Sequence, residues 1–364
     1  MQPLSRRKAV LRALVKFHLF CFLSGRRLTI ARPDSRPALT RIIKLEFALG
    51  AGHYLHRRLR KDIALGRPAH VLFGGKMPTT IAAGFEKLRS NLQITGLQGT
   101  TVSTRQKNVR ANLAKEMEVL DDFLTGSYKR DTMVAPLKEA DVDVFIVLNS
   151  KHFTQDGHAS LLDQVKRALK KSYTEATDIS RNGQAVTIKF SDVAIDVVPG
   201  FNRNGGGYLI PDAIAKRWIS TDPKKHVQIW TDRNTNQKGQ LIPLIKMIKG
   251  WNKKHSQLFR SFHLEALVLQ ILNNVTISDY PSGVRYVFDK ARTQVATVVS
   301  DPAGYGDNLG KYLLEKTKLQ DVKDRLERAH SGAVEAEQLA ASGKIEAAYG
   351  KWRVIFGDYF PAYG

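Results

Sequence analysis

Three aspartates in apolar surroundings are the residues of this chain best suited to metal chemistry. Asp141 and Asp143 open the segment DVDVFIVL at 141–148, and Asp196 lies inside VAIDVVP. Residues i and i+2 of a strand point to the same face, so the first two aspartates would form a cradle for a divalent metal. An unpaired carboxylate in an apolar strand is costly, and a metal ion would compensate Asp196. A single Asp-x-Asp is also common in a solvated turn, and Asp192 is a rival third carboxylate beside a turn, where bonding the backbone is a sufficient role.

Hydrophobic periodicity predicts the elements that would position these aspartates. Apolar residues recur at helical spacing from Ile81 to Leu92, and a second helix is predicted over 104–123. The apolar run 144–148 is typical of a strand buried on both faces, in the centre of a sheet. The other expected elements are an amphipathic helix over 158–173, neighbouring strands over 185–190 and 193–198, a segment over 208–211 that leads into a loop containing Trp218 and His226, and helices over most of the chain beyond Gly239.

The composition is that of a folded protein with a basic surface. With 364 residues and 43% hydrophobic content, the chain is long enough for one large two-lobed domain or two modest ones. The single cysteine, Cys21, excludes an internal disulfide and a cysteine-based zinc site, which fits a reducing cytoplasm. The net charge is +23, and the +9 carried by the residues after 76 suits a polyphosphate ligand or a nucleic acid, although a solvated lysine-rich surface gives the same composition.

Residues 1–76 differ from the rest of the chain in charge. They carry 17 basic and 3 acidic side chains, a net charge of +14, and the remaining residues carry +9. The best apolar run, 9–23, is interrupted by Arg12, Lys16 and His18, which makes it too short and too charged for a membrane span or a signal peptide. We expect a basic extension that is disordered or results from a misassigned gene start, with Met77 as the initiator, and no membrane partner.

Two stretches give the sequence its resemblance to a known enzyme family: GSYKRDTMVAPLKEADVDVF at 126–145 and VAIDVVPGF at 193–201. A Gly-Ser pair, a following Asp-x-Asp and a later strand aspartate resemble the nucleotidyltransferase superfamily with a polymerase-β-like palm. The match is closer to the bacterial cGAS/DncV-like nucleotidyltransferases (CD-NTases), which synthesise cyclic oligonucleotide signals in CBASS anti-phage defence. The resemblance implies an α+β fold, with a mixed-sheet palm and flanking helices over 77–235 and a helical nucleotide-binding lobe with a C-terminal tail over 236–364.

The resemblance also implies roles for the site residues. Asp141, Asp143 and Asp196 would hold two Mg²⁺ ions roughly 3.5–4 Å apart, with Mn²⁺ as a substitute, one activating the attacking hydroxyl and the other bridging the triphosphate. Gly126 would let backbone amides approach the nucleotide phosphates because it has no side chain, and Ser127 would donate a hydrogen bond to them.

Contacts to the donor phosphates are implied in the helical lobe. Ser261, together with Lys246 or Lys249 from the preceding helix, would make them, and the resemblance does not choose between the two lysines. A lysine-rich helix face in solvent is the competing interpretation.

Contacts near the base are less specific. Asp301, with Asn308 nearby, resembles the family's Asp-Pro loop beside the nucleotide pocket, and a plain turn explains it nearly as well. Tyr208 or Tyr305 would stack on a base, although a lone aromatic residue near glycines more often packs. The histidines offer no catalytic pair, and we interpret them as structural or solvent-facing.

We therefore expect a cytoplasmic, Mg²⁺-dependent nucleotidyltransferase that joins NTPs, ATP among them, into a cyclic di- or trinucleotide and releases pyrophosphate. Its partners would be the NTPs, an effector that senses the product, and a HORMA-type or ubiquitin-transfer-like regulator. The tail GDYFPAYG is a candidate for conjugation through Gly364, or it packs on the domain through Phe360 and Tyr363. Two alternatives keep the fold: an RNA-tailing or nucleotide-adding enzyme, and a catalytically silent nucleic-acid sensor.

Overall fold

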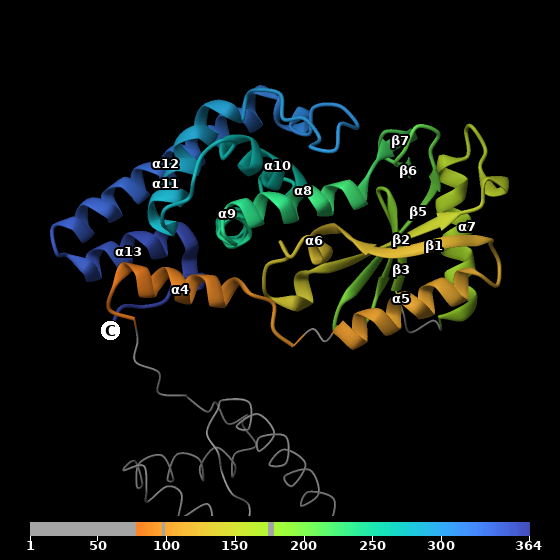
Figure 1. The fold of residues 1–364 in the computed structure, drawn as a ribbon, viewed down its shortest axis with the longest axis horizontal. Coiled ribbons are helices and arrows are strands. Elements are labelled where there is room, and N and C mark those ends of the chain that lie inside the picture. The colour runs from red at the N-terminus through yellow and green to blue at the C-terminus, as the bar shows by residue number, and fades with distance from the viewer. Residues whose placement is uncertain (1–77, 97–98, 174–177) are drawn as a thin grey trace, which may run out of the picture. The chain divides into compact units, whose positions relative to one another are not determined.

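The computed structural model describes residues 78–96, 99–173 and 178–364, so the expectations for residues 1–76 lie outside it. These residues form a mixed β-sheet with flanking helices and a helical lobe (Figure 1), the α+β class that the sequence predicts. No helix in the described ranges is long and apolar enough to cross a membrane.

A seven-stranded sheet in the described residues carries the three aspartates. Its main path runs β1-β2-β5-β4-β3, and β6 joins the far end of β5 and pairs with β7. Strands β2 and β5 run parallel, and the other pairs are antiparallel. The strands cover Val119–Thr125 (β1), Asp141–Leu148 (β2), Asp178–Asn182 (β3), Ala185–Lys189 (β4), Ala194–Asn202 (β5), Tyr208–Asp212 (β6) and Arg217–Thr221 (β7).

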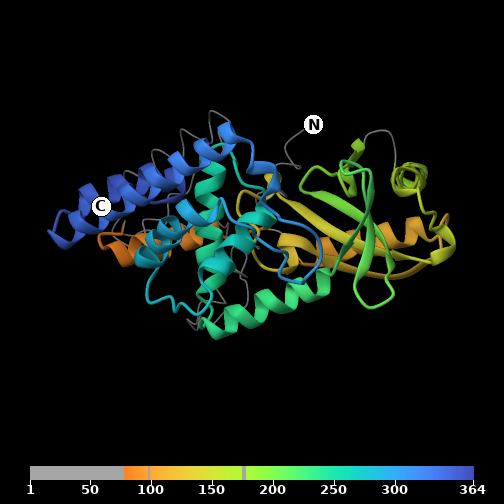
Figure 2. The same ribbon diagram turned by 90° about the horizontal axis from the view of Figure 1, so that it is seen from above.

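Helices flank this sheet and build a second lobe. Helices α5 and α7 pack on the sheet, α8 connects it to α9, and the later helices pack on one another and on α4 (Figures 1 and 2). The helices cover Ile81–Leu92 (α4), Gly99–Leu113 (α5), Gly126–Lys129 (α6), His158–Ser172 (α7), Pro223–Asn236 (α8), Leu241–Lys254 (α9), Ser261–Ile271 (α10), Tyr280–Gln294 (α11), Lys316–Ala341 (α12) and Ile345–Phe356 (α13).

The two faces of β2 have different surroundings. Val142, Val144 and Ile146 are fully buried in the cluster that also contains the apolar residues of α5 and α7. Because side chains alternate along a strand, Asp141 and Asp143 point to the opposite face. The central, buried position of β2 confirms the prediction made from its apolar run.

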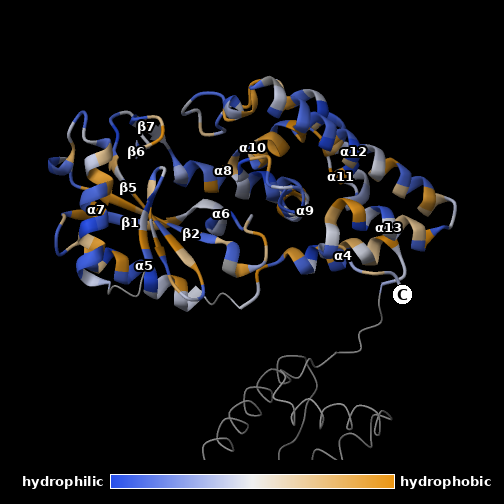
Figure 3. Ribbon diagram, turned by 180° about the vertical axis from the view of Figure 1, so that it is seen from behind, coloured by the Kyte–Doolittle hydropathy of each residue, from blue (hydrophilic) through white to orange (hydrophobic). Residues whose placement is uncertain are grey.

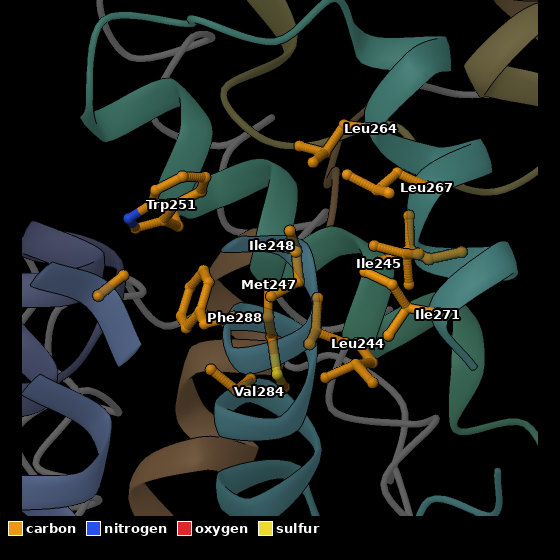
Figure 4. Close-up of a cluster of buried hydrophobic side chains, with 14 of the residues drawn as sticks. Leu244, Ile245, Met247, Ile248, Trp251, Leu264, Leu267, Ile271, Val284 and Phe288 are labelled. Carbon is orange, nitrogen blue, oxygen red and sulfur yellow. The ribbon is translucent and has the colours of Figure 1, made fainter. Parts of the chain in front are cut away.

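The helical lobe has its own hydrophobic core. Figure 4 shows side chains of α9, α10 and α11 meeting in it, among them Ile248, Leu267 and Phe288. Helix α4 joins this core through buried residues such as Phe85, although it precedes the sheet in sequence. In Figure 3 the strands and the helices both carry hydrophobic and hydrophilic colours, as expected for elements with one buried face.

The C-terminal tail packs on the helical lobe. Phe360 is fully buried and its ring meets those of Phe85 and Tyr349, and Tyr363 makes a ring contact with Tyr349. Gly364 itself is exposed. The packed tail that we considered is therefore present, and conjugation through Gly364 stays a prediction.

Two local predictions are wrong. The helix expected over 104–123 ends at Leu113, and β1 follows from Val119, because pairing with β2 overrides local helical periodicity. The loop expected between β6 and residue 226 instead contains β7 and the start of α8. The signal for α8 was present in the sequence: Asp222 caps the helix by accepting a hydrogen bond from the Lys225 amide, and Pro223 occupies its first turn.

Candidate active site

The sheet brings the three aspartates to one place. Asp143 on β2 and Asp196 on β5 are direct partners across the parallel pair, and Asp141 lies two residues before Asp143 on the same face. All three line a cavity of about 620 Å³ between the sheet and the helical lobe. The pairing of β2 with β5 therefore places carboxylates from segments more than fifty residues apart next to one another.

The turn after β1 closes tightly over Asp143. Gly126 begins the short helix α6 with φ +64°, a conformation that L side chains rarely adopt. A Cβ at this position would lie 1.6 Å from Asp143 Oδ2, so the carboxylate fills the space that any side chain would need. Ser127, the next residue, lines the same cavity. The glycine is thus required by both its backbone conformation and its neighbour.

The aspartates form a concentration of negative charge without adequate cationic partners. Burial, and then the charge of Asp196, raises the pKa of Asp143 to about 7, with only Arg130 opposing the shift among the main causes. Burial also raises the pKa values of Asp141 and Asp196, and in Asp196 a hydrogen bond from the Thr187 hydroxyl opposes the shift. A bound cation would relieve this repulsion.

The donor set fits a hard divalent metal, although the side chains are not yet gathered around one point. Carboxylate oxygens are the ligands that Mg²⁺ and Mn²⁺ prefer. Among the described residues no three acidic, histidine or cysteine side chains converge closely enough to enclose an ion. In this structure Asp196 is bonded to Thr187 and Asp143 rests against Gly126, so both would reorient toward a metal.

The wall of the cavity opposite the aspartates is basic and comes from the helical lobe. Lys249 and Lys253 on α9 line it, together with Arg260 and Ser261 at the start of α10. Tyr312 also lines it, and its ring lies 4.5 Å from the Arg260 guanidinium carbon. Carboxylates on one side and cations with a hydroxyl on the other suit a metal-bound polyphosphate between them.

Comparison with known proteins identifies the family. Residues 79–234 match the Second Messenger Oligonucleotide or Dinucleotide Synthetase domain, SMODS. The cyclic AMP-AMP-AMP synthase of an Acinetobacter species is 31% identical over 256 residues, which cover 66% of this chain and 72% of that protein. The chain belongs to the CD-NTase family. It is therefore a nucleotidyltransferase and a cyclic oligonucleotide synthase, a class of enzyme that uses nucleoside triphosphates and a divalent metal.

Solved CD-NTase structures share the fold. CdnC of Escherichia coli MS115-1, solved with ATP, matches with a TM-score of 0.62 at 16% identity, covering 77% of this chain and 98% of that one. The same protein in complex with HORMA-deltaN matches with a TM-score of 0.60 at 15% identity, covering 76% of this chain and 96% of that one. Vibrio cholerae DncV, bound to 3'-deoxy GTP, matches with a TM-score of 0.54 at 18% identity, covering 76% of this chain and 80% of DncV. The polymerase-β-like palm with a helical C-terminal lobe is thereby confirmed.

The structure separates the two candidate lysines of this CD-NTase. Lys249 lines the cavity with the aspartates. Lys246, three residues earlier on α9, instead bonds Asp131 at 2.8 Å and Gln93 at 2.9 Å and lines a different pocket of about 370 Å³. Neither lysine lies on a solvated face: Lys246 is 4% exposed and the Lys249 side chain 10%. The competing interpretation of a solvent-facing helix surface is wrong for both.

Asp301 does not line the cavity of the aspartates. It is buried, accepts a hydrogen bond from the Ala303 amide, and lies 2.6 Å from Nε2 of His226. The Asp-Pro loop is therefore held by a buried His-Asp pair, so of the two roles considered for the histidines, structural or solvent-facing, His226 has the structural one. Asn308 likewise accepts hydrogen bonds from backbone amides of its own loop.

Three further residues considered in the sequence analysis lie outside the cavity of the aspartates. Tyr208 is buried and its ring lies against Phe123 and Phe145, so it packs in the sheet. Asp192 forms an ion pair with Arg105 and does not line the cavity. The guanidinium carbon of Arg203 lies 5.5 Å from the centre of the Tyr305 ring.

The sequence analysis gave no role to one residue that contacts the cavity-lining Lys249. Glu265 on α10 is fully buried and bonds two cations, Arg130 Nε at 3.0 Å and Lys249 Nζ at 2.7 Å. Burial opposes its ionisation, but Arg130 and Lys249 more than offset that and lower the pKa of Glu265 to about 2. Burial lowers the pKa of Lys249, and Glu265 opposes the change. An acid in the middle of the apolar segment SFHLEALVLQI was the available signal.

Proposed function

We propose that this CD-NTase uses Asp141, Asp143 and Asp196 to bind Mg²⁺, with Mn²⁺ as a substitute, and joins NTPs into a cyclic di- or trinucleotide. The observation that carries the proposal is the Asp143–Asp196 pairing beside the Gly126 turn, across a cavity from a basic wall. When bound, the metal lowers the pKa of the attacking ribose hydroxyl and neutralises charge on the triphosphate.

The protein's own part is binding and orientation. Gly126 allows the α6 amides to approach the phosphates, and Ser127 donates a hydrogen bond there. Lys249 and Ser261 bind the donor phosphates from the helical lobe, which sets the α-phosphate in reach of a second nucleotide's ribose hydroxyl. As the sequence suggests, the catalytic aspartates would then lie in the lobe formed by 77–235, and the lobe formed by 236–364 would help to bind the nucleotide.

ATP is the substrate that the comparisons favour. The Acinetobacter relative is named for a product made only of AMP units, and E. coli CdnC was solved with ATP. CdnC was also solved with HORMA-deltaN, which supports a HORMA-type regulator for this enzyme as well. An effector that senses the product, a ubiquitin-transfer-like partner that conjugates Gly364, and a cytoplasmic location remain parts of the proposal.

The test is mass spectrometry of the products formed from all four NTPs with Mg²⁺, with and without added RNA. We expect a cyclic product containing AMP, formed from NTPs alone and absent from the Asp141→Asn/Asp143→Asn variant. Growth of the added RNA would support the nucleotide-adding alternative. Tight RNA binding without turnover would support the silent sensor, and full activity in the double variant would reject the aspartates as the metal site.

A further inference from the structure

The buried Glu265 connects helix α9 with the residue that follows α6. One carboxylate oxygen accepts a hydrogen bond from Lys249 on α9, and the other accepts one from Arg130, which directly follows α6. The Arg130 guanidinium carbon also lies 5.3 Å and 5.1 Å from the rings of Trp230 and Phe262. Through its hydrogen bond with Arg130, Glu265 of the helical lobe therefore contacts the turn that carries Gly126 and Ser127.

Lys249 reaches the same turn by a second route. Its ammonium group donates a 2.7 Å hydrogen bond to the carbonyl of Thr132, and the Thr132 amide in turn bonds the carbonyl of Ser127 at 2.9 Å. An ammonium group has three donors. Within the described residues two of them are taken by Glu265 and Thr132, which leaves one for a ligand in the cavity that Lys249 lines.

A lysine side chain has four rotatable carbon–carbon bonds, so its position must be fixed if it is to bind a phosphate at little entropic cost. A fully buried carboxylate does this well, because it is both rigidly packed and charged. We infer that Glu265 is a positioning residue, which holds Lys249 against the Gly126–Ser127 turn with one donor free for the triphosphate. The inference rests on the proposed role of Lys249 in binding donor phosphates.

The test compares ligands that differ only in their phosphates. Affinities for a non-hydrolysable ATP analogue and for AMP are measured by calorimetry in the full-length wild type, Glu265→Gln, Lys249→Met and the double variant. Glu265→Gln is expected to weaken binding of the ATP analogue roughly tenfold and to leave AMP binding within about twofold. When Lys249→Met is already present, Glu265→Gln is expected to weaken binding of the ATP analogue by less than a further twofold or so, because Glu265 acts through Lys249.

Three results would overturn the inference: equal losses for ATP analogue and AMP, additive losses in the two backgrounds, or unchanged binding in Glu265→Gln. Glu337→Gln is the matched control, since it removes a carboxylate from the Arg285–Glu337 ion pair between α11 and α12. It should leave both affinities unchanged.

A second comparison covers the case in which Glu265→Gln does not fold. Arg130→Gln/Glu265→Gln keeps the net charge of the cluster at its wild-type value, and Arg130→Gln alone retains the Lys249–Glu265 pair. Weaker binding of the ATP analogue in the double variant than in Arg130→Gln supports the inference, and equal binding rejects it. If the wild type formed no product from NTPs, the proposed function would fail; if it formed product while Glu265→Gln bound the analogue normally, only the inference would.

Discussion

The pKa values of two buried carboxylates, Asp143 in the cavity and Glu265 bonded to the cavity-lining Lys249, move in opposite directions. Asp143 has a pKa of about 7 and Glu265 one of about 2. Both shifts begin with burial, which raises a carboxyl pKa, so burial alone does not explain the difference. The neighbours do: Glu265 bonds Arg130 and Lys249, whereas Asp143 faces Asp196 and Asp141.

The difference distinguishes the charge of Glu265, which stabilises the fold, from the charge of Asp143, which is proposed to bind a metal. A buried carboxylate with two cations is already neutralised, so it orders the residues around it. A carboxylate crowded by other carboxylates destabilises the empty protein and is compensated only when a cation binds. On the proposed function, the chain thus has a functional acid that lines the cavity and a fully buried structural acid that bonds one of the lysines lining it.

The largest expected effect comes from Asp143→Asn. Synthesis of the cyclic product should fall at least roughly a thousandfold, because the proposed metal site loses one of its ligands. The metal-free protein should nevertheless become more stable at neutral pH. Since the pKa of Asp143 is raised on folding, its ionisation costs the wild type roughly 1–3 kcal/mol of stability as pH rises from about 4 to about 7. The asparagine variant should lose less stability over this range, because only Asp141 and Asp196, whose pKa values are also raised, still contribute.

Urea unfolding in EDTA across this pH range measures the second effect, and mass spectrometry of the product measures the first. Identical pH profiles in the two proteins would show that Asp143 is adequately compensated without metal, which would remove the contrast with Glu265.

Glu265→Gln should change stability in the opposite direction. It leaves Arg130 and Lys249 as buried cations without their carboxylate, which lowers the free energy of unfolding by about 3 kcal/mol near neutral pH. The folded-state pKa of Glu265 is lowered, so this contribution is present above about pH 4.5 and is lost as pH falls toward 2. Chemical denaturation at pH 7 checks it.

Glu337→Gln serves again as the control, since its ion pair with Arg285 is partly exposed and is worth only about 1 kcal/mol or less. If Glu265→Gln proved no more destabilising than this control, Glu265 would not be the structural acid of the comparison.

The sequence was sufficient for the parts of the site that depend on local pattern. The apolar run after Asp143 predicted a central strand, and alternation along that strand predicted that Asp141 and Asp143 share a face. An acid inside an apolar strand singled out Asp196. That Asp196 would share a metal site with Asp143 was implied only by the resemblance, and their pairing across β2 and β5 was not predicted, because the register between two distant strands is a tertiary property.

Choices that depend on helix packing were beyond the sequence. Lys246 and Lys249 lie less than one turn apart on α9, and only the packing of that helix sends one to Asp131 and the other to Glu265. Glu265 carried the same signal as Asp196, an acid in an apolar segment, but which cations would pair with it depended on how the two lobes meet.

The most direct test of the account is the position of the metal. In crystals grown with Mn²⁺ and a non-hydrolysable ATP analogue, anomalous scattering should show a peak roughly 2.1 Å from carboxylate oxygens of Asp143 and Asp196, with none at Glu265. The triphosphate should lie between that peak and Lys249. A bound nucleotide without metal at these aspartates, or metal coordinated by Glu265, would contradict the division between functional and structural acids.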